Sequence, residues 1–162
     1  MVVYFYGHTK SNGHFSNFYK SKFVISANVI GMSDEIEVAC AEQAIMWLKA
    51  LLMGDTNMAK TIAGETSPVK CKAYGRQVSP FDKVKWFEHR NKIAFEVVRL
   101  KFEDPTFKKI LLATNDEIIA EASARDKIWG IGISVTNAEK GMSWKGENIL
   151  GKTLMLVRNH VK

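Results

Sequence analysis

The pattern of hydrophobic and polar positions first predicts β-strands at three places along the chain. Residues 2–6 (VVYFY) and 22–30 (KFVISANVI) are rich in β-branched and aromatic side chains, which favours extended backbone. Residues 117–123 (EIIAEAS) alternate apolar and polar positions, as expected for a strand with one buried face. We expect these strands and the glycine-punctuated segment 126–135 to form one small sheet.

A helical period of apolar residues covers most of the remaining chain. It predicts a helix over 35–54, a longer one over 81–102 and a closing one over 148–161. The buried side of the first should comprise Ala41, Ala44, Ile45, Leu48, Leu51 and Leu52. The buried side of the second should comprise Val84, Phe87, Ala94, Val97, Val98 and Phe102.

Capping residues indicate where the helices begin and end. The signals are Asp55 before a helix that ends at Gly64, Ser67-Pro68 before one that ends at Gly75, Ser79-Pro80 before the 81–102 helix, and Asp104-Pro105 before a further helix. Helix is therefore the majority element. The order of the elements predicts an α+β fold, a mostly helical single domain over residues 1–162 with a small β-sheet.

The composition agrees with one globular domain and indicates the kind of partner. The 162 residues are 46% hydrophobic, enough to form a core. The 23 Lys and Arg residues against 17 Asp and Glu give a net charge of +6, which favours an anionic partner such as nucleic acid, a nucleotide or a sugar phosphate. No apolar run approaches the roughly 18 residues of a membrane span, and no basic region precedes an apolar stretch near the N-terminus. We expect a cytoplasmic protein with no membrane partner.

Several common catalytic and metal-binding patterns are missing. The sequence has no P-loop, no H-E-x-x-H and no G-x-S-x-G, and GIGIS at 130–134 lacks the third glycine of a dinucleotide fingerprint. The histidines lack metal-ligand spacing. Cys40 and Cys71 belong to no C-x-x-C pair, so we interpret both as small buried side chains. We therefore expect neither a metal nor a cofactor.

Four clusters hold polar residues that core packing alone does not explain. They are FSNFY at 15–19, the pair Glu42 and Lys49, DKIWGIG at 126–132, and W-x-G-x-N-x-L-G at 144–151 with Arg158 downstream. Together with Gly75-Arg76 and Lys101-Phe102, in this order, they closely resemble the NADAR family, also called the YbiA-like family. The resemblance runs from Tyr4 to Arg158. It departs from the family pattern at Gln43, which replaces a His, and at Met46, which replaces a Gln.

The resemblance implies an N-glycosidase or an ADP-ribose-related hydrolase on a mostly helical α+β fold. Similar enzymes cleave the N-glycosidic bond of phosphoribosylamino-pyrimidine intermediates of riboflavin biosynthesis, and this is our leading expectation for the substrate. Related ones act on ADP-ribosylated guanine in nucleic acid, which is the alternative within the enzyme class. A non-catalytic module that binds ADP-ribose or NAD is the alternative from a different class.

The residue types in these clusters suit such chemistry. Cleavage of a ribosyl C1–N bond develops oxocarbenium character, so a carboxylate that stabilises the cation or activates water assists it. Glu42 and Asp126 are the candidate carboxylates, and Asp126 stands near Trp129, which can shield charge or stack on a base. Lys49 permits a second route, in which an unprotonated amine attacks C1 and the ring-opened sugar forms a Schiff base.

Substrate binding is expected from other polar residues of the same clusters. The candidates are Ser16, Asn17 and Asn148 for ribose hydroxyls or phosphate oxygens, Arg76 and Arg158 for phosphate, and Trp129 with Gly130 in the WGIG segment. Structural roles remain the alternative for several of them. Asp126 could cap its loop, Asn17 could be a turn residue and Asn148 a helix N-cap, while Arg76 could complement a helix end and Arg158 an internal ion pair.

Overall fold

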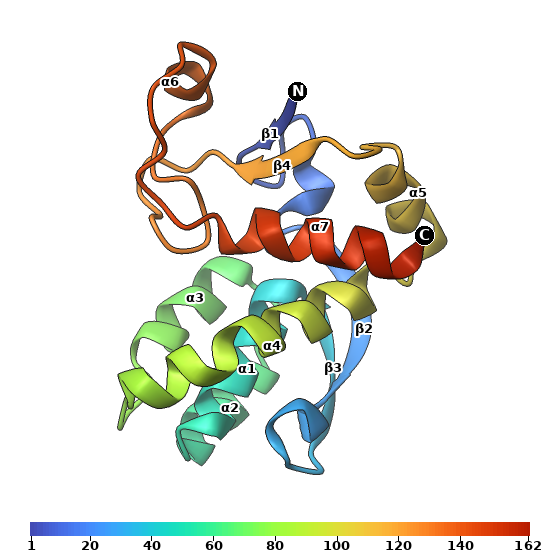
Figure 1. Cartoon of the computed structure of the whole chain (residues 1–162). Helices are drawn as coiled ribbons and strands as arrows, with labels where there is room; N and C mark the ends of the chain where they lie inside the picture. The colour runs from blue at the N-terminus through green and yellow to red at the C-terminus, as the bar shows by residue number, and fades with distance from the viewer. The chain divides into compact units, whose positions relative to one another are not determined.

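The computed structural model describes residues 1–162, and the chain divides into two units (Figure 1). We name Lys20–Lys101 the central unit, and Met1–Tyr19 together with Phe102–Lys162 the terminal unit. Each unit combines helices with a two-stranded sheet, so the predicted α+β class with a majority of helix is confirmed. None of the helices combines the length and the apolar character that a membrane crossing needs.

The central unit is built around helix α1 (Ala41–Leu52), in which ten of twelve residues are buried. Three further helices pack against it, namely α2 (Thr56–Ala63), α3 (Pro68–Arg76) and α4 (Lys83–Lys101) (Figure 1). The antiparallel strands β2 (Lys20–Ser26) and β3 (Glu35–Cys40) are connected through a 3-10 turn, η2 (Ala27–Ile30). Strand β2 contacts α4, and β3 leads directly into α1 and contacts it.

Strand β3 corrects the prediction that a helix begins at residue 35. Glu35 and Glu37 are exposed, whereas Val38 and Cys40 are buried, so the segment EIEVAC has the period of two that a half-buried strand needs. It pairs with β2, and the helical period begins only at Ala41. The apolar residues before Ala41 belong to the sheet, although they also fit a helical pattern.

Local capping confirms three of the predicted helix starts. The Asp55 carboxylate accepts the backbone N–H of Met58, and the Ser67 hydroxyl accepts that of Lys70. The Asp104 carboxylate does the same for the first turn of α5 (Pro105–Leu112). In each case a short polar side chain satisfies an N–H group that has no partner inside its own helix, so the signal is local and can be predicted from sequence.

Two predicted helix boundaries, the start of α4 and the end of α3, differ from the structure. Helix α4 begins at Lys83, not directly after Ser79-Pro80, and the Asp82 carboxylate accepts the Lys85 N–H at 3.0 Å. Gly75 lies inside α3, which continues to Arg76, so the prediction that Gly75 follows the helix end is wrong. This glycine is used for close packing, as described below for the site.

The buried side of α4 agrees with the prediction at Ala94, Val97 and Val98 but differs from it near the start of the helix. Val84 is 67% exposed and Phe87 is 48% exposed. The buried residues are Trp86, Arg90, Ile93, Ala94, Val97, Val98 and Lys101. Two of them, Arg90 and Lys101, are cationic. A search for a periodic pattern of apolar residues cannot identify a buried side that includes cations.

The terminal unit contains a parallel pair of strands, β1 (Val2–Phe5) and β4 (Ile118–Glu121). Helix α7 (Ile149–Val161) packs against β4 and α5, and the short α6 (Val135–Glu139) lies in the long connection from β4 to α7 (Figure 1). The strands therefore form two separate pairs, and the prediction of one sheet is wrong. Residues 126–134 contain no strand.

Aromatic side chains fill the interior of the terminal unit. The ring of Phe15 lies 5.7 Å from that of Phe5 and 6.2 Å from that of Phe102, and all three are fully buried. Phe15 ends a 3-10 turn, η1 (Gly13–Phe15), so this packing fixes the start of the predicted cluster FSNFY.

Candidate functional site

Two of the predicted catalytic residues lie on α1 in the central unit. Glu42 is in the first turn and is 9% exposed. Lys49 follows two turns later and is half-buried, and its Nζ donates a hydrogen bond to the carbonyl oxygen of Gly75 at 2.7 Å. The carbonyl belongs to the last turn of α3, where backbone oxygens lack intrahelical partners and a cation is favoured.

Aromatic rings surround the Lys49 amine. Its Nζ lies 4.9 Å from the ring centre of Phe81 and 5.6 Å from that of Trp86. Burial lowers the pKa of Lys49, the Glu42 carboxylate acts in the opposite direction, and the Arg76 guanidinium lowers the pKa further. Glu42, Lys49 and Arg76 therefore share one electrostatic environment, and Arg76 itself is exposed.

The two departures from the family pattern both have structural roles on α1. The Gln43 side chain accepts the Ala39 N–H at 2.8 Å and donates to the Ile62 carbonyl at 3.0 Å, so it joins the start of α1 to the end of α2. Met46 is 8% exposed and packs against Gly75 of α3. Both side chains therefore contribute to the contacts between α1 and the neighbouring helices.

Sequence reasoning missed the groups that surround Lys49. Phe81 and Trp86 were not among the candidates, and Gly75 was interpreted as a helix end. Phe81 is 48% exposed although it is a large apolar residue directly after Ser79-Pro80. An exposed aromatic side chain beside a turn can indicate a functional site, but the sequence does not show that the side chain is exposed.

Asp126 organises a loop in the terminal unit. Its Oδ1 accepts the backbone N–H groups of Ile128 at 2.9 Å and Trp129 at 2.8 Å. The side chains of Asp126 and Trp129 are both half-buried. The loop-capping role that the sequence left open is therefore present, and it uses one of the two carboxylate oxygens.

The loop that contains Trp129 and Gly130 is bonded to the segment before α7 through backbone groups. The carbonyls of residues 127–131 accept five N–H groups of residues 145–150, at 2.8 to 3.1 Å. A side chain at Gly130 would lie 2.8 Å from the Glu121 carbonyl oxygen, and one at Gly146 would overlap the backbone of Gly130. These glycines are required because two backbones approach closely.

Asn148 and Arg158 make internal hydrogen bonds in the terminal unit. The Asn148 amide donates to the Ile119 carbonyl at 3.0 Å and accepts the Glu121 N–H at 3.1 Å, so it joins α7 to β4 and does not cap its own helix. Arg158 is 4% exposed and its Nη1 donates to Thr114 and to the Glu117 carbonyl, both at 2.8 Å. The geometry gives both residues structural partners.

Ser16 and Asn17 are also largely buried, at 4% and 7% exposure. The Ser16 hydroxyl accepts the Phe18 N–H at 3.1 Å, as in a tight turn. Asn17 Oδ1 is buried and has no hydrogen-bond partner. A buried acceptor without a partner is costly, so this oxygen is an unsatisfied group of the terminal unit, but its burial keeps it out of reach of a ligand in this conformation.

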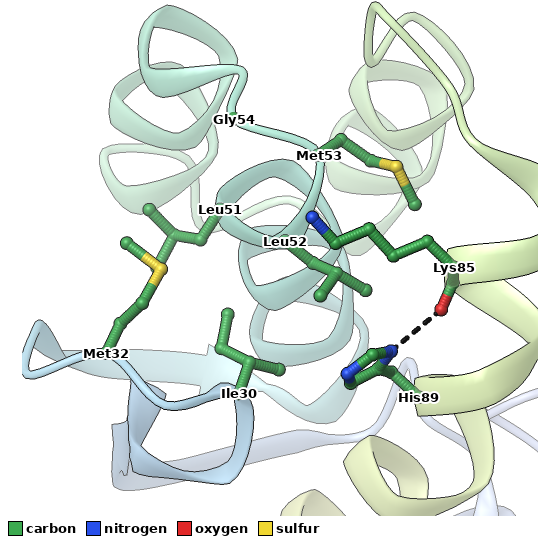
Figure 2. A pocket seen from close by; sticks show the side chains of 8 residues that line it. All are labelled: Ile30, Met32, Leu51, Leu52, Met53, Gly54, Lys85 and His89. Atoms are coloured by element: carbon green, nitrogen blue, oxygen red, sulfur yellow. Dashed lines mark hydrogen bonds between the residues drawn. The ribbon is translucent and has the colours of Figure 1, made fainter.

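Two pockets lie apart from the predicted residues. One of about 350 Å³ opens beside the end of α1 in the central unit, lined by apolar side chains with Lys85 and His89 (Figure 2). There His89 Nδ1 donates to the Lys85 carbonyl at 2.8 Å, as the dashed line in Figure 2 shows. The other, of about 1190 Å³, follows β1 in the terminal unit. None of the predicted site residues lines either pocket.

The structure contains neither a cluster of metal-ligating side chains nor a reactive thiol. No group of three or more His, Cys, Asp or Glu side chains is close enough to hold a metal ion. Cys40 and Cys71 are free and buried, as interpreted from the sequence. Burial raises the pKa of the Cys71 thiol to about 12 and also raises that of Cys40, so both are protonated and weakly nucleophilic at neutral pH.

Comparison with known proteins identifies the family. The model of the NADAR domain matches residues 4–162, a range that includes both units. The chain therefore belongs to the NADAR family, and the resemblance seen in its motifs is confirmed. The solved structure of the Escherichia coli protein YbiA is similar, with a TM-score of 0.75 and 25% identity, over 99% of this chain and 84% of that one.

Two of three named relatives are described as N-glycosidases. An N-glycosidase of Acanthamoeba polyphaga mimivirus is 37% identical, over 96% of this chain and 94% of its own. An N-glycosidase of Nostoc punctiforme is 31% identical, over 100% of this chain and 94% of its own. A riboflavin biosynthesis protein of Vibrio vulnificus is 23% identical over 99% of this chain, which corresponds to 38% of that protein.

Proposed function

We propose that this protein hydrolyses the N-glycosidic bond between a ribosyl group and its base in a phosphorylated, nucleotide-like substrate. Its class, a hydrolase of N-glycosyl compounds, agrees with two N-glycosidases to which it is 37% and 31% identical over nearly its whole length. The leading substrate is a phosphoribosylamino-pyrimidine of riboflavin biosynthesis. The similarity to a riboflavin biosynthesis protein of Vibrio vulnificus supports this choice.

The observation that carries the proposal is the environment of Lys49. A half-buried amine lies over two aromatic rings, on the same helix as the buried Glu42 carboxylate, and its pKa is lowered by burial. A carboxylate and an amine with a lowered pKa provide a base and an acid at one place. Arg76 adds an exposed cation that suits a phosphate.

In the leading route water is the nucleophile. Glu42 takes a proton from water as the water oxygen bonds to C1 and the C1–N bond breaks. The departing base nitrogen receives a proton, for which the Lys49 ammonium, the cation on α1, is the candidate donor. The carboxylate also stabilises the oxocarbenium character of the transition state. Asp126 is the second candidate carboxylate, since one of its oxygens is already used in its loop.

In the second route Lys49 is the nucleophile. The unprotonated Nζ bonds to C1, the C1–N bond to the base breaks, and one Nζ proton ends on the base nitrogen. The sugar ring then opens as C1–O breaks and the ring oxygen takes the remaining proton, which leaves an imine. Water adds to the imine carbon and releases the free sugar and the amine.

The test is to incubate the purified protein with the candidate substrates and to follow release of the free base. Glu42→Gln and Asp126→Asn are measured beside the wild type, and we expect Glu42→Gln to lower kcat by about a hundredfold or more. Lys49→Ala with borohydride trapping separates the routes. Absence of reductive trapping, with activity intact in Lys49→Ala, would exclude the imine route.

A second candidate substrate is ADP-ribosylated guanine in nucleic acid, and one surface of the central unit favours it. Phe81 and Phe87 are each 48% exposed, and cations lie over both rings: Lys49 over Phe81, and Lys83 at 5.7 Å and Arg90 at 4.6 Å over Phe87. Exposed aromatic rings among cations are typical of surfaces on which bases of single strands stack.

The two substrates are separated by salt dependence. Activity on a modified oligonucleotide should exceed that on small nucleotides and fall steeply as salt rises, because cations on the protein replace counterions of the phosphates. Equal activity on both, insensitive to salt, would contradict the nucleic-acid substrate. If the protein binds ADP-ribose and cleaves nothing, it is a binding module and the proposed activity fails.

A further inference from the structure

We infer that Gly75 is a positioning residue for Lys49, because the lack of a side chain at this position lets α3 approach α1 closely enough for the Gly75 carbonyl to hold the Lys49 amine. The inference rests on the proposed function for its catalytic consequence. Its structural part depends only on the contacts among α1, α3 and Lys49 in the central unit.

The contact between the two helices leaves no space for a β-carbon at position 75. An added Cβ would overlap the Sδ atom of Met46 and would lie 2.9 Å from its Cγ, whereas its distance to the Met46 Cβ, 3.4 Å, is ordinary contact. The Met46 side chain is flexible, but it is 8% exposed and moving Cγ requires a new χ1 rotamer on a packed helix face.

The backbone conformation alone does not require glycine at position 75. Gly75 lies inside α3 and is not among the glycines with positive φ. Alanine is the better helix former by about 1 kcal/mol, so glycine is intrinsically the poorer choice here. What excludes alanine is the outer part of the Met46 side chain.

The same residue contacts α1 at two successive places on one face. Met46 and Lys49 are three residues apart, so their side chains lie next to each other on the helix surface. The Cα of Gly75 packs against the first and its carbonyl oxygen accepts from the second at 2.7 Å. A displacement of α3 from Met46 therefore also takes the carbonyl away from Lys49.

Displacement should change the chemistry of the amine. Burial is the largest cause of the lowered pKa of Lys49, with Glu42 and Arg76 as the charged groups that act on it. If α3 moves outward, water reaches the amine and its pKa rises toward the ordinary value. Less of the amine is then unprotonated at neutral pH, and its position relative to a bound sugar is lost.

The experiment compares Gly75→Ala, Met46→Ala, the double variant and Gly64→Ala. The last is a matched control, since an added Cβ at Gly64 meets nothing closer than 3.8 Å. The pKa of Lys49 is measured without substrate, from the pH dependence of its acetylation by acetic anhydride followed by mass spectrometry. The value of kcat/KM is measured on whichever substrate the wild type cleaves.

We expect Gly75→Ala to raise the pKa of Lys49 and to lower kcat/KM by about tenfold or more. In the double variant the new Cβ occupies the space left by Sδ and Cγ, so both quantities should return close to wild type. Met46→Ala alone should shift the pKa in the same direction by less, which tests the idea even if Gly75→Ala does not fold. Gly64→Ala should change neither.

An unchanged pKa of Lys49 in Gly75→Ala, or no recovery in the double variant, would overturn the inference. The acetylation measurement also separates this inference from the proposed function. If the wild type cleaves no substrate, the proposed function fails. The pKa values of Lys49 in the wild type and in the four variants still decide whether Gly75 positions Lys49.

Discussion

The side-chain amide of Asn148 holds the backbone of Glu121, because its Oδ1 accepts the Glu121 N–H at 3.1 Å while its Nδ2 donates to Ile119. Asn148 is 2% exposed and has φ of 55°, in the left-handed region that Asn tolerates better than most residues. Asn148 therefore connects the start of α7 to β4, although the sequence also made it a candidate for binding ribose.

Asn148→Ala should be strongly destabilising. It removes the partner of the part-buried Glu121 N–H and of the buried Ile119 carbonyl and adds strain at positive φ, so we expect a loss of about 2–4 kcal/mol in the free energy of unfolding. Urea denaturation checks this value. Loss of activity in Asn148→Ala at unchanged stability would instead return Asn148 to the binding site.

Asp126 gives a prediction in which two substitutions differ. Asp126→Asn keeps an oxygen that accepts the N–H groups of Ile128 and Trp129, so stability should remain within about 0.5 kcal/mol of wild type. Asp126→Ala removes the acceptor and should cost about 1–2 kcal/mol. Thermal unfolding of the two variants side by side measures the difference, and equal stabilities would show that the loop does not depend on this side chain.

Gln43 should be sensitive to replacement by an apolar residue of similar size. Gln43→Leu removes both the acceptor for Ala39 and the donor for Ile62, and Gln43 is 2% exposed. We expect a loss of about 1–2 kcal/mol, because the part-buried Ala39 N–H loses its partner while the Ile62 carbonyl still accepts the Glu65 N–H. Chemical denaturation tests this. Wild-type stability in Gln43→Leu would mean that the link between α1 and α2 contributes nothing.

Lys101 predicts how stability depends on pH. It is fully buried at the end of α4, and burial lowers its pKa to about 7, with Cys40 acting in the opposite direction. The unfolded chain binds this proton up to the ordinary lysine pKa near 10.5, so between pH 7 and 10.5 the unfolded state binds more protons. The contribution of Lys101 to stability therefore rises with pH in this window and is constant below pH 7.

The measurement compares wild type with Lys101→Met. The free energy of unfolding of the wild type should rise relative to the variant by at most about 1.4 kcal/mol per pH unit from pH 7 to 9. Both proteins keep Cys40 and Cys71, whose raised pKa values make stability fall with rising pH through the thiol range, so the difference between the curves is the informative quantity. Parallel curves would contradict the prediction.

Sequence reasoning succeeded where the cause of a structure is local. The caps at Asp55, Ser67 and Asp104 depend on one side chain and the next few N–H groups, and all three are found as predicted. Strand β3 was missed because EIEVAC fits both periods, and only pairing with β2 decides between them.

The site could be predicted only in part, for a related reason. Glu42 and Lys49 were expected on one helix, and they lie on α1; the effect of Arg76 on the pKa of Lys49 was not predicted. The partner of Lys49 is a backbone carbonyl of another helix. Every residue has such a carbonyl, so the residue type does not predict which one binds Lys49. The same limit applies to Asn148, whose partners lie 27 and 29 positions away along the chain.

The backbone hydrogen bonds between residues 127–131 and 145–150 explain why two of the family's motifs contain glycine. The glycines at 130 and 146 are needed for that approach of two backbones, whatever substrate the protein accepts. The glycines of the WGIG and W-x-G-x-N-x-L-G motifs are therefore explained by backbone packing, whereas the proposed chemistry would depend on Glu42 and Lys49 of α1. A variant without Lys49 would keep both glycine-containing motifs and would still resemble the family in them, so these motifs alone do not report whether the proposed chemistry is present.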